Sequence, residues 1–227
     1  MRLRQRFVAL AVSLCAVAFS APDLNARVAN SSLETATKLA KGEVVVEMHE
    51  QGGIKYVSGK ILIKEPAARV WPILTNPFEY QGKICPHMKN LRVMTDTQQM
   101  SRLHVDVDCG VLMPLLSYVV ESHYIPDSRI DFRRIDGNIK DFRGYWLLEP
   151  MADQKQCQVT YSMYIEPGFP VPQWIVREGV KMELPRTLLG LRKRVNAICE
   201  SNAVPEARSI QASRQTCLVT KEHESTN

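Results

Sequence analysis

The chain has 227 residues, of which 45% are hydrophobic and 23% are charged, with 11 Gly and 13 Pro. These values exclude a collagen, a long coiled coil and a wholly disordered chain. At roughly 100–200 residues per domain, the length fits one domain with extensions, and such a chain buries a sizeable core without metal or disulfide staples.

The N-terminal residues have the pattern of an export signal. Arg2, Arg4 and Arg6 precede an apolar run of 13 residues, Phe7–Phe19, which is short for a bilayer span but typical of a signal peptide. An uncleaved signal anchor is the alternative. Residues 1–20 are therefore predicted to be a signal peptide.

Cleavage of this segment changes the charge. Ala18-Phe19-Ser20 offers a small-x-small cleavage step, and a second possible cut follows Ala26. The formal net charge falls from +5 to +2 without residues 1–20, because 26 basic and 24 acidic residues remain. Charge therefore gives no support to a nucleic-acid partner. We expect an extracytoplasmic protein, periplasmic or secreted.

The first predicted elements are a helix and a hairpin. Residues 21–42 form an N-terminal segment with a helix expected at 27–42. The pattern then changes to strands at 43–50 and 55–64, and Gly52-Gly53 between them predicts a β-hairpin.

Proline residues shape the next segment. Pro66 is tolerated in a first helical turn, but Pro72 and Pro77 predict that the helix over 66–80 is short and broken. Its expected apolar side consists of Val70, Trp71, Leu74 and Phe78. A second short helix or turn is expected around residues 83–90.

Successive strands and a long helix follow. The strands are predicted at 91–97, 100–109, 115–125, 128–136, 141–150 and 156–166. Their short connections predict an antiparallel meander. Helical spacing then gives one apolar face, made of Val180, Leu184, Leu188, Leu191, Val195 and Ile198. Pro185 must kink or split this helix. The polar residues 201–227 predict a disordered tail.

An antiparallel sheet with one face to cover and an amphipathic closing helix can enclose an apolar cleft. Three segments of the chain also resemble a known superfamily. They are PAARVWPILTNPFEY, FRRIDGNIKDFRGYWLLEP and YIEPGFPVPQWIVREGVKMELPRTLLGLRKRV. They are similar to the START-like polyketide cyclase/lipid-transport superfamily (SRPBCC), and within it to the coenzyme Q-binding, START-type domains of bacterial exported proteins.

The resemblance covers about residues 43–200 and implies an α+β helix-grip fold. In this fold a curved antiparallel sheet wraps around a long C-terminal helix and encloses an apolar cavity. The chain departs from the family at Asn76, where an acidic residue is common, and in the loop that follows. Members include carriers, cyclases, hydrolases and regulators, so the fold leaves the function open.

Aromatic and apolar side chains on elements around the expected cavity are the candidate ligand-binding residues. They are Trp71, Phe78, Tyr80, Trp146, Tyr161, Trp174, Met182 and Leu188. Large aromatic and flexible Met side chains suit apolar contact, although most buried aromatic residues serve only as core.

The sharpest polar pattern is the alternation of His104, Asp106 and Asp108, which places three potential acid–base or metal groups on one strand face. The simpler interpretation is a solvated face, and we favour it because no second ligand source has matching spacing. The chain lacks the nucleophile, phosphate-loop and dinucleotide motifs. No catalytic residue, metal or cofactor is therefore assigned.

Basic residues cluster around the Asp136-Gly137-Asn138 turn, namely Arg129, Arg133, Arg134, Lys140 and Arg143. They suggest transient contact with an anionic membrane surface, or a solvated strand face whose interleaved Asp residues cancel the charge.

Five cysteines remain after export. Cys109 and Cys157 could form a disulfide, or both could be free.

These observations predict an exported, non-enzymatic protein that sequesters or transfers a lipid, isoprenoid or polyketide-like ligand. One alternative is a cyclase- or hydrolase-type enzyme using His87, Asp106 or Tyr161, and the face on which Asp106 lies would discriminate. Another is a cell-envelope interaction module using the helix at 27–42 and the tail at 201–227.

Overall fold

The computed structural model describes residues 24–110 and 114–224, and it describes side chains for residues 31–110 and 114–201. The chain divides into two units, residues 1–34 and 35–227. The predicted signal peptide lies outside the described residues.

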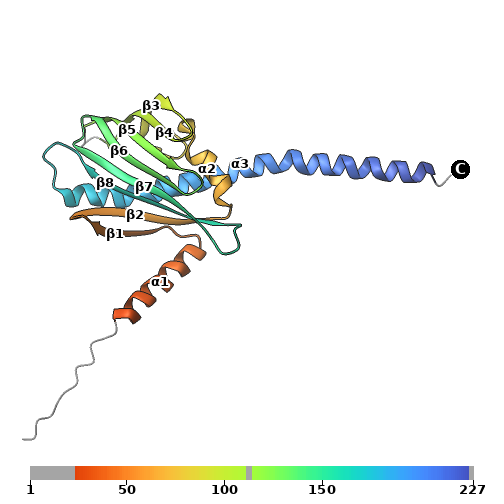
Figure 1. The fold of residues 1–227 in the computed structure, drawn as a ribbon, viewed down its shortest axis with the longest axis horizontal. Helices are drawn as coiled ribbons and strands as arrows, with labels where there is room; N and C mark the ends of the chain where they lie inside the picture. The colour runs from red at the N-terminus through yellow and green to blue at the C-terminus, as the bar shows by residue number, and fades with distance from the viewer. Residues whose placement is uncertain (1–23, 111–113, 225–227) are drawn as a thin grey trace, which may run out of the picture. The chain divides into compact units, whose positions relative to one another are not determined.

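The elements follow the order expected from the sequence (Figure 1). They are α1 (Leu24–Ala40), β1 (Val45–Gln51), β2 (Ile54–Ile63), α2 (Ala67–Leu74), the 3-10 turn η1 (Pro77–Glu79), β3 (Met88–Asp96), β4 (Met100–Val107), β5 (Leu116–Ile125), β6 (Arg129–Gly137), β7 (Asp141–Pro150), β8 (Cys157–Glu166) and α3 (Gln173–Glu224).

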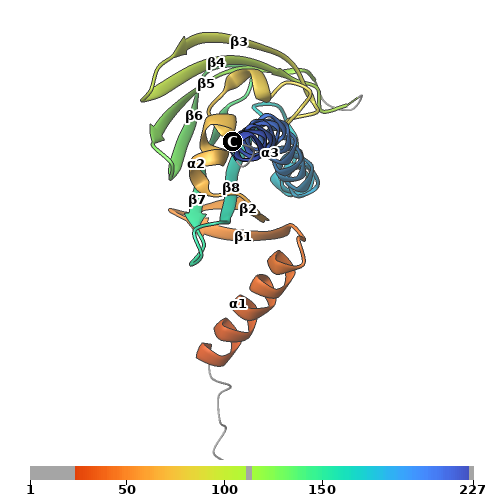
Figure 2. The same ribbon diagram turned by 90° about the vertical axis from the view of Figure 1, so that its right-hand side faces the viewer.

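Eight strands form one antiparallel sheet in the order β1-β2-β8-β7-β6-β5-β4-β3. Figure 2 shows the sheet curving around α2 and α3. Register shifts between β3 and β4, and between Val119 and Val120 where β5 pairs with β6, contribute to this curvature. The predicted α+β architecture, a curved antiparallel sheet with a long C-terminal helix, is confirmed.

The first hairpin forms as predicted. Gly52 and Gly53 have φ values of 59° and 76°, which a residue without a side chain adopts at no steric cost. The hairpin places Ile61 and Ile63 on the covered face of β2, where both are fully buried.

The closing helix buries the face that its spacing predicts. Leu184, Leu188, Leu191 and Val195 have no exposed surface, and they pack against the inner face of the sheet. Pro185 lies within α3, which is continuous from Gln173 to Glu224, so the proline does not split the helix. Pro185 is tolerated because tertiary packing of the flanking turns holds the helix in place.

Residues 83–90 form a turn that leads into β3, which is one of the two alternatives expected there. Two other local predictions differ from the structure. The segment 201–227, predicted to be disordered, is helical as far as Glu224. Its Ala, Arg, Gln, Glu and Lys residues favour helix, and elongating an existing helix avoids the cost of nucleation.

The second difference concerns Phe78, which is 71% exposed. Extending the 3.6-residue period of α2 across Pro77 placed Phe78 on the buried side. The chain instead enters η1, whose shorter period turns Pro77 and Glu79 inward and Phe78 outward.

Candidate functional site

The inner face of the sheet can be traced from Gly59. A Cβ atom at Gly59 would meet the Leu188 side chain of α3, so this position faces the helix. Gly59 pairs with Tyr161 of β8, and Tyr161 pairs with Trp146 of β7. Directly paired residues share a face, and Tyr161 and Trp146 therefore also point toward the helix side.

Five aromatic side chains form a continuous row on this inner face. We call Trp146, Tyr161, Phe132, Phe142 and Tyr118 the aromatic row. Trp146 stacks on Tyr161 with centroids 3.7 Å apart, and successive centroids then lie 5.9 Å (Tyr161–Phe132), 4.9 Å (Phe132–Phe142) and 5.2 Å (Phe142–Tyr118) apart. Each member is at most 8% exposed.

The 80–85 turn brings two further polar groups toward the row. Tyr80 donates a hydrogen bond to the Leu74 carbonyl oxygen at 2.6 Å, and its backbone oxygen accepts from the Cys85 amide at 2.8 Å. The turn approaches α3 closely at Gly190, where a Cβ atom would lie 2.7 Å from the Ile84 carbonyl oxygen. This close approach fixes Cys85 beside Thr187 of the helix.

Burial keeps these polar groups uncharged. Desolvation raises the pKa of Tyr80, Tyr118 and Tyr161 well above the usual value for a phenol. Desolvation also raises the pKa of Cys85 to about 12, against the opposing effect of the Thr187 hydroxyl. At neutral pH the site therefore presents hydroxyl and thiol groups in an apolar setting.

An ion pair stands next to this cluster. His87 Nε2 lies 3.4 Å from a carboxylate oxygen of Glu183 on α3, and Arg186 lies 3.4 Å from the same residue. The negative charge of Glu183 contributes to the raised pKa of Cys85, Cys109 and Tyr161. His87 is an exposed residue of the turn that also contacts the closing helix.

The predicted binding residues divide between interior and surface. Trp146, Tyr161 and Leu188 are buried, and Trp71 and Tyr80 are half-buried. Trp174 and Met182 are 62% and 65% exposed, so these two lie on the surface, as Phe78 does. Met182 precedes the fully buried Leu184 by two positions, which is about 200° around a helix.

Sequence reasoning missed Tyr118, Phe132, Phe142 and Cys85. The first two could have been found from strand alternation, because Tyr118 shares a face with Val120, and Phe132 with Ile130. Which face is the inner one depends on register across the whole sheet.

The strand face that carries His104, Asp106 and Asp108 points to solvent, which is the interpretation favoured from the sequence. Val105 is 2% exposed and points inward, so its neighbours point outward. Asp106 accepts a hydrogen bond from Asn90 at 3.3 Å, and hydrogen bonding from Ser117 is the main cause of its lowered pKa. In the described ranges, no cluster of His, Cys, Asp and Glu side chains could hold a metal ion.

The basic residues of β6, β7 and the turn between them are largely paired with acidic ones. Arg129 contacts Asp131 at 2.7 Å, Arg133 contacts Glu121 at 2.9 Å and Lys140 contacts Glu166 at 2.6 Å. Arg143 pairs with Asp141. These pairs reduce the positive field that an anionic membrane would meet.

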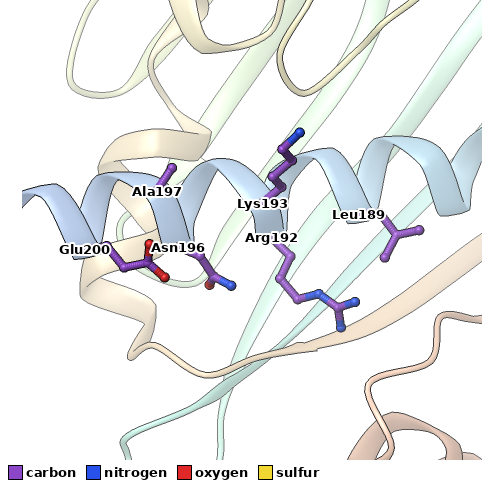
Figure 3. Close-up of a pocket in the computed structure, with 6 residues that line it drawn as sticks. All are labelled: Leu189, Arg192, Lys193, Asn196, Ala197 and Glu200. Atoms are coloured by element: carbon purple, nitrogen blue, oxygen red, sulfur yellow. The ribbon is translucent and has the colours of Figure 1, made fainter.

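A separate groove of about 510 Å³ lies on α3. Its lining side chains project from successive turns of the helix (Figure 3): Leu189, Arg192, Lys193, Asn196, Ala197 and Glu200. Arg192 donates to the Gly42 carbonyl oxygen at 2.8 Å. This groove is rich in charged and amide groups, unlike the interior.

Over the residues with assigned structure, no helix is long and apolar enough to span a membrane.

Comparison with solved structures gives the same fold. The STAR-related lipid transfer protein fragment from Xanthomonas axonopodis is 21% identical with a TM-score of 0.55, covering 67% of this chain and 93% of its own. The Zhui aromatase/cyclase from Streptomyces sp. R1128 is 14% identical with a TM-score of 0.55, covering 66% and 94%. Human StAR-related lipid transfer protein 5 is 11% identical with a TM-score of 0.54, covering 77% and 99%.

No curated protein matches the chain. The family model described as "Polyketide cyclase / dehydrase and lipid transport" matches residues 63–192. This range runs from the end of β2 into α3 and contains the entire aromatic row. The chain belongs to the polyketide cyclase / dehydrase and lipid transport family.

Proposed function

We propose that this protein binds a hydrophobic ligand between its sheet and α3, and that it sequesters or transfers this ligand. The observation that carries the proposal is the aromatic row, a continuous apolar surface on the inner face of the sheet. Such surfaces with a few polar groups are typical of small-molecule sites. Lipid, isoprenoid and polyketide-like ligands all fit this chemistry.

The energetics of such a site favour reversible transfer. Each CH₂ group moved from water into an apolar interior contributes roughly 0.8 kcal/mol. Relative to a membrane this gain largely disappears, because the acyl region is equally apolar. A ligand can therefore move in either direction between protein and bilayer.

Export is part of the proposal. Arg2, Arg4 and Arg6 followed by the apolar run Phe7–Phe19 support an extracytoplasmic location. The resemblance to exported coenzyme Q-binding domains supports an isoprenoid-type ligand within the proposed range. Membrane contact would be transient, since the basic residues near β6 and β7 are mostly paired.

A catalytic role has less structural support. Asp106 would have to point inward to serve as an acid or base, and it lies on the outer face beside Asn90. His87 is engaged with Glu183. Tyr161 does face the interior, and burial keeps its hydroxyl protonated, which suits hydrogen bonding to a ligand.

Lipid uptake from vesicles tests the proposal. The purified protein is incubated with phosphatidylcholine vesicles containing a trace of a fluorescent apolar lipid, separated by gel filtration, and assayed for bound lipid. We expect up to about one lipid per chain, consistent with a single interior site. Absence of co-eluting lipid would contradict the proposal.

Two neighbouring residues of β7 provide a matched pair of variants. Trp146 points inward, whereas Tyr145 points outward beneath Arg129, whose guanidinium carbon lies 4.2 Å from the Tyr145 ring centroid. Trp146→Leu should reduce lipid uptake, and Tyr145→Leu should not. Thermal unfolding of both variants verifies that each remains folded under the assay conditions.

A further inference from the structure

Two tyrosines of the aromatic row carry hydroxyl groups that are available to a ligand. Tyr118 of β5 and Tyr161 of β8 are each 8% exposed. Within the described part of the chain, neither hydroxyl makes a hydrogen bond. Neither oxygen is among the fully enclosed polar atoms that lack a partner, so both hydroxyls keep accessible surface. Native structures pair nearly all polar groups of the interior, and a ligand oxygen would accept from both hydroxyls.

These hydroxyls face the same space as other polar groups. A charge on Tyr118, Tyr80 or Cys85 would disfavour ionisation of Tyr161, and a charge on Cys85 would act on Tyr118 in the same way. The groups therefore lie within electrostatic reach of one another. Tyr80 already donates its proton to the Leu74 carbonyl oxygen, which leaves Tyr118 and Tyr161 as the free donors.

The electrostatic surroundings of the two tyrosines disfavour an anionic ligand. Glu183 is the charged residue that acts on both Tyr161 and Cys85. The Arg186 guanidinium lies 3.4 Å from the Glu183 carboxylate and is therefore already paired, and His87 Nε2 lies 3.4 Å from the same carboxylate. A carboxylate or phosphate placed here would be desolvated beside a like charge, which is strongly unfavourable.

We propose, resting on the binding function proposed above, that Tyr118 and Tyr161 form a head-group site for an uncharged hydrogen-bond acceptor. The ligand is an amphiphile whose head is a carbonyl, ester or hydroxyl oxygen and whose apolar body lies against Phe132, Phe142 and Trp146. The two phenols donate to the head, and the row holds the body. The site thus selects neutral amphiphiles over fatty acids and phospholipid head groups.

Three probes of equal chain length distinguish the contribution of the ligand head to binding from that of its apolar body. They are decane, 2-decanone and decanoate. Each is titrated at pH 7 against the full-length mature protein loaded with the neutral fluorophore N-phenyl-1-naphthylamine, and its Kd is obtained from displacement. We expect Tyr118→Phe and Tyr161→Phe each to raise the Kd of 2-decanone about fivefold, the value of one net hydrogen bond. The Kd of decane should change less than about twofold in either variant, because no hydrogen bond is lost.

Tyr145→Phe is the matched control, since it removes a phenolic hydroxyl from the outer face of β7. It should leave all three Kd values unchanged. Decanoate should bind wild type at least about tenfold more weakly than 2-decanone, because its charge must be desolvated. Melting temperatures of the variants close to that of wild type separate lost contacts from lost folding.

The outcomes distinguish the two proposals. If decane and 2-decanone bind but the tyrosine substitutions leave the Kd of 2-decanone unchanged, or if decanoate binds most tightly, the head-group site is overturned while the binding function stands. If neither the fluorophore nor any probe binds wild type, the binding function itself is contradicted.

Discussion

Gly59 of β2 lies directly beneath Leu188 of α3, and a Cβ atom at Gly59 would be 2.7 Å from Leu188 Cδ1 and 3.5 Å from Leu184 Cβ. Both leucines are fully buried, so neither can move aside without disturbing the core. The absence of a side chain at one strand position thus sets how closely the closing helix approaches the sheet.

Gly59→Ala should therefore destabilise the protein by about 1–3 kcal/mol, the usual cost of overpacking a core. Urea unfolding measures the change. Gly179→Ala is the control, because Gly179 lies in α3 and a Cβ atom there would have no neighbouring atom within 4 Å, and Ala favours helix over Gly by about 1 kcal/mol. Equal stability of Gly59→Ala and wild type would show that the contact is not tight.

The ion pair between Glu79 of η1 and Arg194 of α3 predicts a pH dependence. Arg194 Nη2 donates to Glu79 Oε1 at 3.1 Å, and Lys83 lies 3.2 Å from the other oxygen. Hydrogen bonding from Arg194 is the largest cause that lowers the pKa of Glu79 below its usual value of 4.5. The stability that this pair adds to the fold is fully present above the pKa of Glu79 in the unfolded chain. It is lost as the pH falls through the lower pKa of Glu79 in the folded protein.

Glu79→Gln should cost about 1–2 kcal/mol at pH 7, because it removes the charge of a buried carboxylate whose partner Arg194 is half-buried. The difference from wild type should shrink as the pH falls below 4.5. Glu178→Gln, which affects an exposed pair with Lys181, should cost less than about 1 kcal/mol. If the loss in unfolding free energy caused by Glu79→Gln stays constant from pH 7 to pH 3, the ion pair does not stabilise the fold as described.

Tyr124 has a hydrogen-bond partner in the protein, in contrast to Tyr118 and Tyr161. Tyr124 donates to Ser101 Oγ at 2.6 Å, and Ser101 is 1% exposed. Tyr124→Phe should destabilise the free protein by about 1 kcal/mol, whereas Tyr161→Phe should be neutral or stabilising without ligand, because its hydroxyl has no partner to lose. Denaturant unfolding of ligand-free protein compares them. If Tyr161→Phe loses more unfolding free energy than Tyr124→Phe, the Tyr161 hydroxyl has a hydrogen-bond partner in the protein.

The described cysteines are free, and this predicts a specific labelling pattern. Cys157 is fully buried at the start of β8, and desolvation raises the pKa of its thiol to about 11. Cys109 is exposed. Iodoacetamide at pH 8 should therefore modify Cys109 at least about tenfold faster than Cys157, since the reactive species is an accessible thiolate. Peptide mass spectrometry that instead finds a Cys109–Cys157 disulfide would contradict this account.

Much of the fold could be predicted from local patterns. Strand alternation located β3 to β8 to within three residues, and the 3.6-residue spacing of Leu184, Leu188 and Leu191 identified the buried face of α3. These signals are local, because one buried face per element imposes its own period on the sequence.

The site was harder to predict because it depends on long-range geometry. The Glu79–Arg194 pair joins residues 115 positions apart, and the inner position of Tyr118 follows from register across β2 to β8. Phe78 was misplaced because Pro77 changes the local helical period. Trp146 and Tyr161 were chosen correctly as interior residues, but their stacking on each other required the structure.

Native mass spectrometry of the protein, expressed from the whole 227-residue sequence and purified without detergent, tests the central claim most directly. The account predicts a stoichiometric apolar adduct that dissociates on solvent extraction and carries a neutral oxygen-containing head. A protein of bare polypeptide mass that also takes up no lipid from vesicles would contradict it.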